Sequence, residues 1–183
     1  KLRIMNEGLI PRRYAKALYK YAQEHHCTQQ LYNDTQRIEE VFATHPALTK
    51  AMGNPAISTT EKEQLLVMAA GSEANNAILR FINLVILNRR ESFFRATMLA
   101  YQDIYRQENN IARVTIITTT TLCDDMIERI KGLLKKQLNK ELEFVYQIDP
   151  SLIGGFVLRV DSMQLDASIQ NELKKLRVKL LNK

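Results

Sequence analysis

The chain has 183 residues, of which 45% are hydrophobic, and its formal net charge is +6. This hydrophobic content excludes a globally disordered protein, and two cysteines are too few for a disulfide framework. No stretch approaches the roughly 20 apolar residues that a membrane-spanning helix needs. Only four prolines and six glycines interrupt the chain, so we expect long and mostly helical elements.

A helical pattern of apolar residues recurs six times in the first 110 residues. We expect Met5 to be the natural start, with no signal peptide before it, and Pro11 to lie in the first turn of the first helix. Ser58 and Glu61 have the spacing of a capping box in front of the fourth helix. The expected helices cover, approximately, residues 11–26, 28–42, 46–52, 58–70, 78–87 and 94–105.

The fifth of these helices is unusually apolar. Eight of the ten residues from Ile78 to Leu87 are apolar, and the exceptions, Arg80 and Asn83, share one narrow stripe. A surface helix normally buries a single apolar stripe. Two interpretations remain open at this point: a central core helix, or a helix with core on one side and a docking groove on the other.

The residues that follow Asn109-Asn110 change in character. Residues 114–121 are β-branched almost throughout, which favours a strand. Residues 142–148 alternate like a half-buried strand, and a helical stripe from 126 to 138 lies between the two. Gly154-Gly155 is expected to open a further strand at residues 156–160.

The end of the chain predicts a hairpin and a last helix. Asp161-Ser162 is the expected turn, and Ser168 is the expected helix cap. The apolar residues of this helix are spaced four, three and four apart, like a short coiled-coil seam: Ile169, Leu173, Leu176 and Leu180. The predicted fold class is mainly α, with an N-terminal six-helix bundle at residues 8–110 and a small α+β C-terminal domain at residues 111–183.

No group of residues in the sequence predicts catalysis or metal binding. His25, His26 and Cys27 are adjacent, and adjacent helical residues point about 100° apart, so they cannot chelate one ion together. Gly154-Gly155 lacks the lysine and the hydroxyl of a phosphate-binding loop, and no nucleophile motif occurs. We therefore expect no enzyme activity, no metal site and no cofactor.

The positive charge motivates an alternative function. The excess is spread along the chain, and its nearest approach to a cluster is Lys174, Lys175, Arg177 and Lys179 near the end of the last helix. Cations there oppose the helix dipole, so a solvated face explains them. A basic helical nucleic-acid-binding protein is nevertheless the second hypothesis.

Three segments resemble a known family, the δ subunit of F-type ATP synthases and its mitochondrial counterpart, the oligomycin-sensitivity-conferring protein. Residues 13–19, Arg-Tyr-Ala-Lys-Ala-Leu-Tyr, resemble its first helix. Residues 81–90, Phe-Ile-Asn-Leu-Val-Ile-Leu-Asn-Arg-Arg, resemble its fifth helix and the turn that follows. Residues 148–160 resemble its C-terminal signature, followed by Asp166 to Ile169 with Ala167 where the family usually has glycine. The resemblance covers residues 8–183.

The resemblance implies a non-catalytic stator subunit that links the α3β3 catalytic head to the b-subunit peripheral stalk. In the family, the first and fifth helices hold the N-terminal segment of an α subunit as an amphipathic helix. The residues expected there are Tyr14, Ala17, Leu18, Tyr21, Ile78, Phe81, Ile82, Val85 and Arg89. The C-terminal domain joins the end of the b subunit, through Gly154, Gly155, Phe156, Ile169, Leu173 and Leu176 as candidates.

The resemblance also implies where the protein works. We expect one copy per complex, a monomer when isolated, and a peripheral position on the cytoplasmic side of a bacterial inner membrane. The membrane would be reached only through the complex, and no nucleic acid would be bound.

Overall fold

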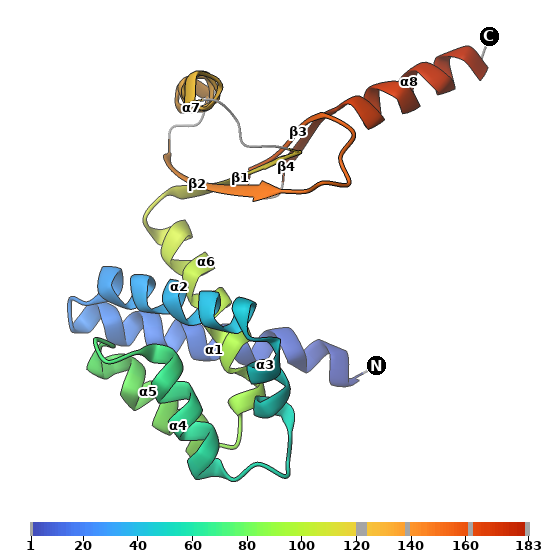
Figure 1. Cartoon of the computed structure of the whole chain (residues 1–183). Helices are drawn as coiled ribbons and strands as arrows, with labels where there is room; N and C mark the ends of the chain where they lie inside the picture. The colour runs from blue at the N-terminus through green and yellow to red at the C-terminus, as the bar shows by residue number, and fades with distance from the viewer. Residues whose placement is uncertain (1, 120–123, 138–139, 161–162, 182–183) are drawn as a thin grey trace. The chain divides into compact units, whose positions relative to one another are not determined.

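The computed structural model describes residues 2–119, 124–137, 140–160 and 163–181. The described chain is mainly helical, with a four-stranded mixed sheet near the C-terminus (Figure 1). It divides into two compact units, Lys1–Tyr105 and Arg106–Lys183. The sequence places the boundary at Asn109-Asn110, a few residues later. The difference arises because Arg106 is buried and pairs with Glu143 of the second unit, 3.8 Å away.

The first unit is built from helices joined by short links. Its elements are α1 (Leu2–Glu24), α2 (Thr28–Thr44), α3 (Pro46–Gly53), α4 (Thr59–Ala70), α5 (Asn76–Leu87), the 3-10 helix η1 (Glu91–Phe93) and α6 (Phe94–Glu108). Figure 1 shows α4 and α5 side by side, with α2 running across them.

The expected start of the first helix is wrong. The helix α1 begins at Leu2 and passes through Pro11, which lies inside it. A proline within a helix removes one backbone hydrogen bond because it has no N–H. The residues before Pro11 are compatible with helix. The helix α1 therefore continues through Pro11 and loses only the hydrogen bond that the missing N–H would have donated.

The capping box predicted at Ser58 and Glu61 is confirmed. The amide of Glu61 donates to Ser58 Oγ at 3.2 Å, and the amide of Ser58 donates to Glu61 Oε2 at 3.0 Å, which completes the capping box of α4. Gly71 ends α4 with φ of 82°, a conformation that favours glycine. Asn75 then caps α5 by accepting a hydrogen bond from the amide of Ala77 at 2.9 Å.

The core of the first unit lies where α2, α4, α5 and α6 meet. Phe94 is fully buried, and its ring lies 6.2 Å from Phe42 and 6.1 Å from Phe81. The other large side chains without exposure are Leu31, Ile38, Leu66, Ile78, Ile82, Met98 and Tyr101. Burial of this aliphatic and aromatic surface, at roughly 25 cal/mol per Å², holds the helices together.

The second unit is a sheet with one helix packed on it. Its elements are β1 (Ile111–Thr118), α7 (Asp124–Gln137), β2 (Glu141–Ile148), β3 (Gly155–Val160), β4 (Met163–Ser168) and α8 (Ile169–Leu181). The strand order is β2-β1-β3-β4, with β1 and β2 parallel and the other pairs antiparallel. Leu134 and Ile130 of α7 pack on one face, against Val114, Ile116 and Leu158. Helix α8 leaves the end of β4 (Figure 1).

The hairpin and the last helix start where the sequence predicts them, within the described residues. Ser168 ends β4, and its Oγ accepts a hydrogen bond from the amide of Asn171 at 3.3 Å. Parts of three predictions lie outside the described residues. They are the expected turn at Asp161-Ser162, the end of the expected strand at Thr120 and Thr121, and Leu138 of the expected helix.

Candidate partner-binding groove

An apolar groove of about 330 Å³ lies between α1 and α5 of the first unit. We call it the α1–α5 groove. Its lining residues are Tyr14, Ala17, Leu18, Tyr21, Ala77, Arg80, Phe81 and Leu84. From Tyr14 to Tyr21 the helix rises about 10 Å, so the groove is long enough for about two turns of a further helix.

The groove exists because α5 has two apolar faces. Ile78, Ile82 and Val85 are buried in the core of the unit. Ala77, Phe81 and Leu84 follow at spacings of four and three, so they form a second stripe rotated away from the first. The structure therefore places the groove next to the core-facing stripe of α5. Phe81 belongs to both, because it lines the groove and its ring lies 6.1 Å from that of Phe94.

The sequence-predicted residues divide accordingly. Tyr14, Ala17, Leu18, Tyr21 and Phe81 line the groove. The other three predicted residues of α5, Ile78, Ile82 and Val85, face inward and are at most 2% exposed, so they do not line it. Arg89 lies in the turn after α5 with φ of 52° and is exposed, outside the groove lining.

Sequence reasoning missed Ala77, Arg80 and Leu84. Leu84 is 47% exposed, which is unusual for a leucine next to so many buried neighbours. The signal that could have found it is the 77-81-84 stripe, which is separate from the 78-82-85 stripe. The two stripes form one apolar surface in the sequence-based prediction, because the sequence alone does not show which stripe faces the other helices.

Two contacts shape the groove walls. The rings of Tyr14 and Phe81 meet edge to face with centroids 6.2 Å apart, which joins α1 to α5 at the groove floor. Arg80 Nη1 donates a hydrogen bond to the hydroxyl of Tyr21 at 3.0 Å, and this contact crosses the groove at its rim. The floor is therefore apolar, and one polar contact lies at the edge.

The predicted stalk-contact residues lie around the β3–α8 junction of the second unit. Gly154 and Gly155 have φ of 156° and 81°, and the Gly154 carbonyl accepts a hydrogen bond from the Ile169 amide at 3.0 Å. Phe156 packs against the core below α7. Ile169 and Leu173 are 49% and 54% exposed on α8. Leu176 lies in α8, but the placement of its side chain is outside the described part of the structure.

The register of the sheet leaves further apolar side chains uncovered. Tyr146 pairs with Ile116, and Leu165 pairs with Leu158, so both point to the same face as the core that α7 covers. Yet Tyr146 and Leu165 are exposed, as are Ile148 and Met163 beside them. The 14-residue helix α7 leaves β4 and the C-terminal half of β2 open on this face, whereas Leu142 and Phe144 at the other end of β2 pack against the core.

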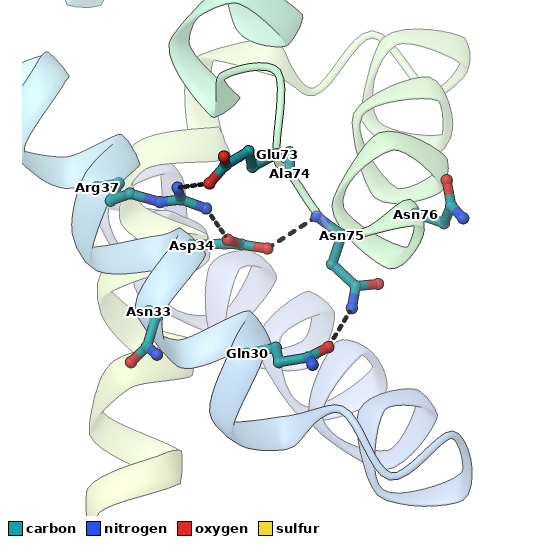
Figure 2. A pocket seen from close by; sticks show the side chains of 8 residues that line it. All are labelled: Gln30, Asn33, Asp34, Arg37, Glu73, Ala74, Asn75 and Asn76. Atoms are coloured by element: carbon teal, nitrogen blue, oxygen red, sulfur yellow. Dashed lines mark hydrogen bonds and ion pairs between the residues drawn. The ribbon is translucent and has the colours of Figure 1, made fainter.

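A polar hollow of about 630 Å³ lies at the N-terminal end of α5, beside the α4–α5 loop (Figure 2). Its groups bond to each other. Buried Asp34 accepts from the amide of Asn75 at 3.0 Å and pairs with Arg37, which also lies 3.9 Å from Glu73. Asn75 Nδ2 donates to Gln30 Oε1 at 3.0 Å. These bonds hold the α4–α5 loop against α2. The polar residues of the hollow therefore have a structural role.

Among the described residues, no three His, Cys, Asp or Glu side chains are grouped so that they could hold a metal ion. The His25 ring lies 4.2 Å from the Tyr21 ring at a tilt of 48°, while Cys27 is buried at the start of α2. None of the described helices is both long enough and apolar enough to span a bilayer.

Comparison with known proteins gives consistent matches over the whole chain. The family model described as ATP synthase delta (OSCP) subunit matches residues 10–180. ATP synthase subunit delta from Parabacteroides distasonis is 35% identical over 177 residues, which cover 97% of this chain and 98% of the relative. ATP synthase subunit delta from Bacteroides thetaiotaomicron is 34% identical over 181 residues, or 98% and 97% of the two chains.

The fold has a counterpart among solved structures. A chain of the Toxoplasma gondii mitochondrial ATP synthase hexamer, solved by cryo-EM, is similar with a TM-score of 0.72 and 18% identity, over 93% of this chain and 97% of that chain. None of these matches supports the nucleic-acid alternative. Delta subunits are non-catalytic, peripheral components of a membrane-associated complex. With a family model that spans almost its full length, this chain belongs to the ATP synthase delta (OSCP) subunit family.

Proposed function

We propose that this protein is the stator connector of a proton-translocating F-type ATP synthase. It links the α3β3 catalytic head to the b-subunit peripheral stalk, so that rotor torque drives ATP synthesis. The observation that carries the proposal is the α1–α5 groove, an apolar surface that the chain's own helices leave uncovered. Residues 8–110 form a six-helix bundle that binds the head, and residues 111–183 bind the stalk.

The proposed occupant of the groove is the N-terminal segment of an α subunit, bound as an amphipathic helix. Helix-in-groove binding uses apolar anchors at positions i, i+3 or i+4 and i+7 of the bound helix. Tyr14, Phe81 and Leu84 provide the complementary apolar wall. Phe81 is only 5% exposed, so Leu84, which is 47% exposed, and the half-buried Tyr14 offer the partner more surface.

The proposed stalk contact lies on the second unit. Ile169 and Leu173 are exposed on α8 at a spacing of four, which places them on one side of that helix. A short seam of this kind packs against another helix in the manner of a coiled coil. The C-terminal helix of the b subunit is the proposed partner. Gly154 and Gly155 act indirectly, because they fix the point where α8 leaves the sheet.

The mechanical task explains why binding, rather than chemistry, is needed. The head must not turn with the central shaft, so the connector has to remain bound at both ends on the time scale of rotation. A nanomolar complex corresponds to about −12 kcal/mol. Apolar burial at roughly 25 cal/mol per Å² contributes to this free energy, and the losses in rotational and side-chain freedom offset part of it. We place the protein on the cytoplasmic side of a bacterial inner membrane, in one copy per complex and monomeric when isolated.

The test is calorimetry of the full chain with a peptide from the N-terminus of the matching α subunit. We expect binding with a negative heat-capacity change, since apolar surface is buried. Leu84→Asp should weaken binding at least about tenfold, because it places a charge in the groove. Leu99→Asp is the matched control, since Leu99 is 37% exposed on α6 and does not line the groove. No binding by the wild type would overturn the proposal.

The stalk contact is tested separately. A soluble C-terminal fragment of the matching b subunit should bind the full chain, and Leu173→Asp should weaken that complex without changing the affinity for the α-subunit peptide. The two surfaces lie in different units, so their substitutions should add independently. If Leu173→Asp leaves the b-subunit affinity unchanged, α8 is not the stalk contact.

A further inference from the structure

We propose that the α1–α5 groove selects a helix with carboxylates along its flanks, and that Arg80 is the residue that determines this selectivity. The inference rests on the proposed function, because it assumes that a helix occupies the groove. It goes further by specifying the charge that the partner must carry. Three observations support it: the position of Arg80, the charges along the α1 side of the groove, and the hydrogen bond between Arg80 and Tyr21.

Arg80 lies at the groove with few competing contacts. It is exposed, and it stands three residues after Ala77 and four before Leu84, both of which line the groove. Its hydrogen bond to the Tyr21 hydroxyl is the one side-chain contact that the described residues give it. A guanidinium has five N–H donors in a planar fork, so this one contact leaves most of its hydrogen-bonding capacity unused.

The α1 side of the groove is also positive. Arg13 lies four residues before Ala17, and Lys20 lies three residues after it, so both border the groove on the outer flank of α1. Both side chains are exposed, and neither forms an ion pair within the described residues. Glu24 is the one acidic residue on the same flank. An apolar floor between two basic borders is complementary to an amphipathic helix with acidic borders.

When a helix occupies the groove, the charge of Arg80 affects how tightly that helix binds. A bound helix removes water from around the guanidinium, and a partly desolvated cation needs a strong hydrogen-bond acceptor. A tyrosine hydroxyl is neutral, whereas a carboxylate accepts two parallel N–H bonds from an arginine fork. Arg80 therefore exchanges Tyr21 for a carboxylate of the partner. A helix with neutral flanks leaves Arg80 covered with only Tyr21 as its acceptor and binds less tightly.

The experiment compares two versions of the α-subunit peptide, with flank positions set to Glu in one and to Gln in the other. Calorimetry with the full chain should show about two- to fivefold tighter binding of the Glu version, the range expected for a partly exposed ion pair. Arg80→Gln should remove most of this preference, and Arg13 and Lys20 account for the remainder. Arg12→Gln, which removes the same charge from the opposite side of α1, should keep the preference. The preference should shrink between about 50 mM and about 300 mM salt.

Tyr21→Phe separates charge recognition from a structural role. If Arg80 exchanges its partner on binding, Tyr21→Phe retains the preference for the Glu version. If Arg80 only positions Tyr21, then Tyr21→Phe and Arg80→Gln weaken both peptides equally, and the inference is overturned. Equal affinity of the wild type for the two versions also overturns it, while leaving the proposed function intact. Failure of both versions and of the unmodified peptide to bind overturns the proposed function as well.

Discussion

Lys62 Nζ donates a hydrogen bond to Glu91 Oε1 at 2.7 Å inside the first unit, although the two residues are 29 positions apart. Their side chains are only 7% and 9% exposed. Lys62 lies in the first turn of α4 and Glu91 begins η1, so the pair joins α4 to the segment that leads into α6. Glu91 Oε2 has no hydrogen-bond partner among the described residues, so Lys62 is the principal compensation for this buried charge.

The first prediction is that replacing Lys62 alone destabilises the first unit more than replacing Lys62 and Glu91 together. Lys62→Met leaves a buried carboxylate without its partner and should destabilise the first unit by about 3–5 kcal/mol. The double variant Lys62→Met/Glu91→Leu removes both charges and should recover most of that loss. The measurement is hydrogen exchange of α4 and α6 amides in the full chain, which reports this unit separately.

Lys50→Met is the control for that measurement. Lys50 is exposed in the last turn of α3, and its replacement should change stability by no more than about 0.5 kcal/mol. A double variant as unstable as Lys62→Met would show that packing of the lysine stem, rather than its charge, stabilises the unit.

The second prediction concerns pH. Burial by itself raises the pKa of Glu91, but the hydrogen bond from Lys62 and the charges of Lys62 and Arg89 outweigh it and hold this pKa below its ordinary value. The folded state therefore favours the carboxylate. The resulting stabilisation is complete above the ordinary glutamate pKa of about 4.3 and is lost as the pH falls through the lower, folded-state value.

Urea titrations of the wild type and Glu91→Gln test this sign. The wild type should be more stable at pH 7, and the difference should shrink towards zero as the pH falls through the lowered folded-state pKa, where Glu91 becomes protonated and resembles glutamine. Glu40→Gln serves as the control, because Glu40 is exposed on α2. A difference between wild type and Glu91→Gln that is constant with pH would contradict an ionised Glu91 in the folded protein.

The parts of the fold that follow from local chemistry were predictable. The Ser58–Glu61 capping box needs only two residues three positions apart, and the structure confirms both of its hydrogen bonds. The alternation from residue 142 to 148 fixes β2 in the same way, because side chains in a strand point alternately to its two faces. Both signals arise from residues that are close together in the sequence, so they can be recognised without knowledge of the tertiary structure.

The parts that depend on distant neighbours were not predictable. Phe81 and Ile78 are both buried apolar residues of α5, yet only Phe81 also lines the groove, and the packing of α1 and α6 decides this difference. Lys62 looks like an ordinary surface lysine until Glu91 is brought to it. Pro11 resembles a helix start, but the helix continues on its N-terminal side.

The third prediction contrasts two glycines of the second unit. Gly155 has φ of 81°, and a Cβ on it would lie 2.3 Å from the carbonyl oxygen of Ala167 and 3.0 Å from Ser168 Cα, both backbone atoms. Gly155→Ala should therefore destabilise the β3–β4 pair by about 2–4 kcal/mol, from the left-handed backbone and the overlap together. Gly132, inside α7, has open space around it, so Gly132→Ala should stabilise that helix by up to about 1 kcal/mol.

Hydrogen exchange of the β3 and β4 amides in the full chain distinguishes the two substitutions. Gly155→Ala should raise exchange in these strands, because the backbone of β4 must move away to admit the new methyl group. The same displacement would shift the start of α8, since the Ile169 amide bonds to the Gly154 carbonyl next to the substituted residue. We therefore expect Gly155→Ala to weaken binding of the b-subunit fragment, and Gly132→Ala to leave it unchanged. Unaltered exchange in Gly155→Ala would mean that the strands are not held this closely.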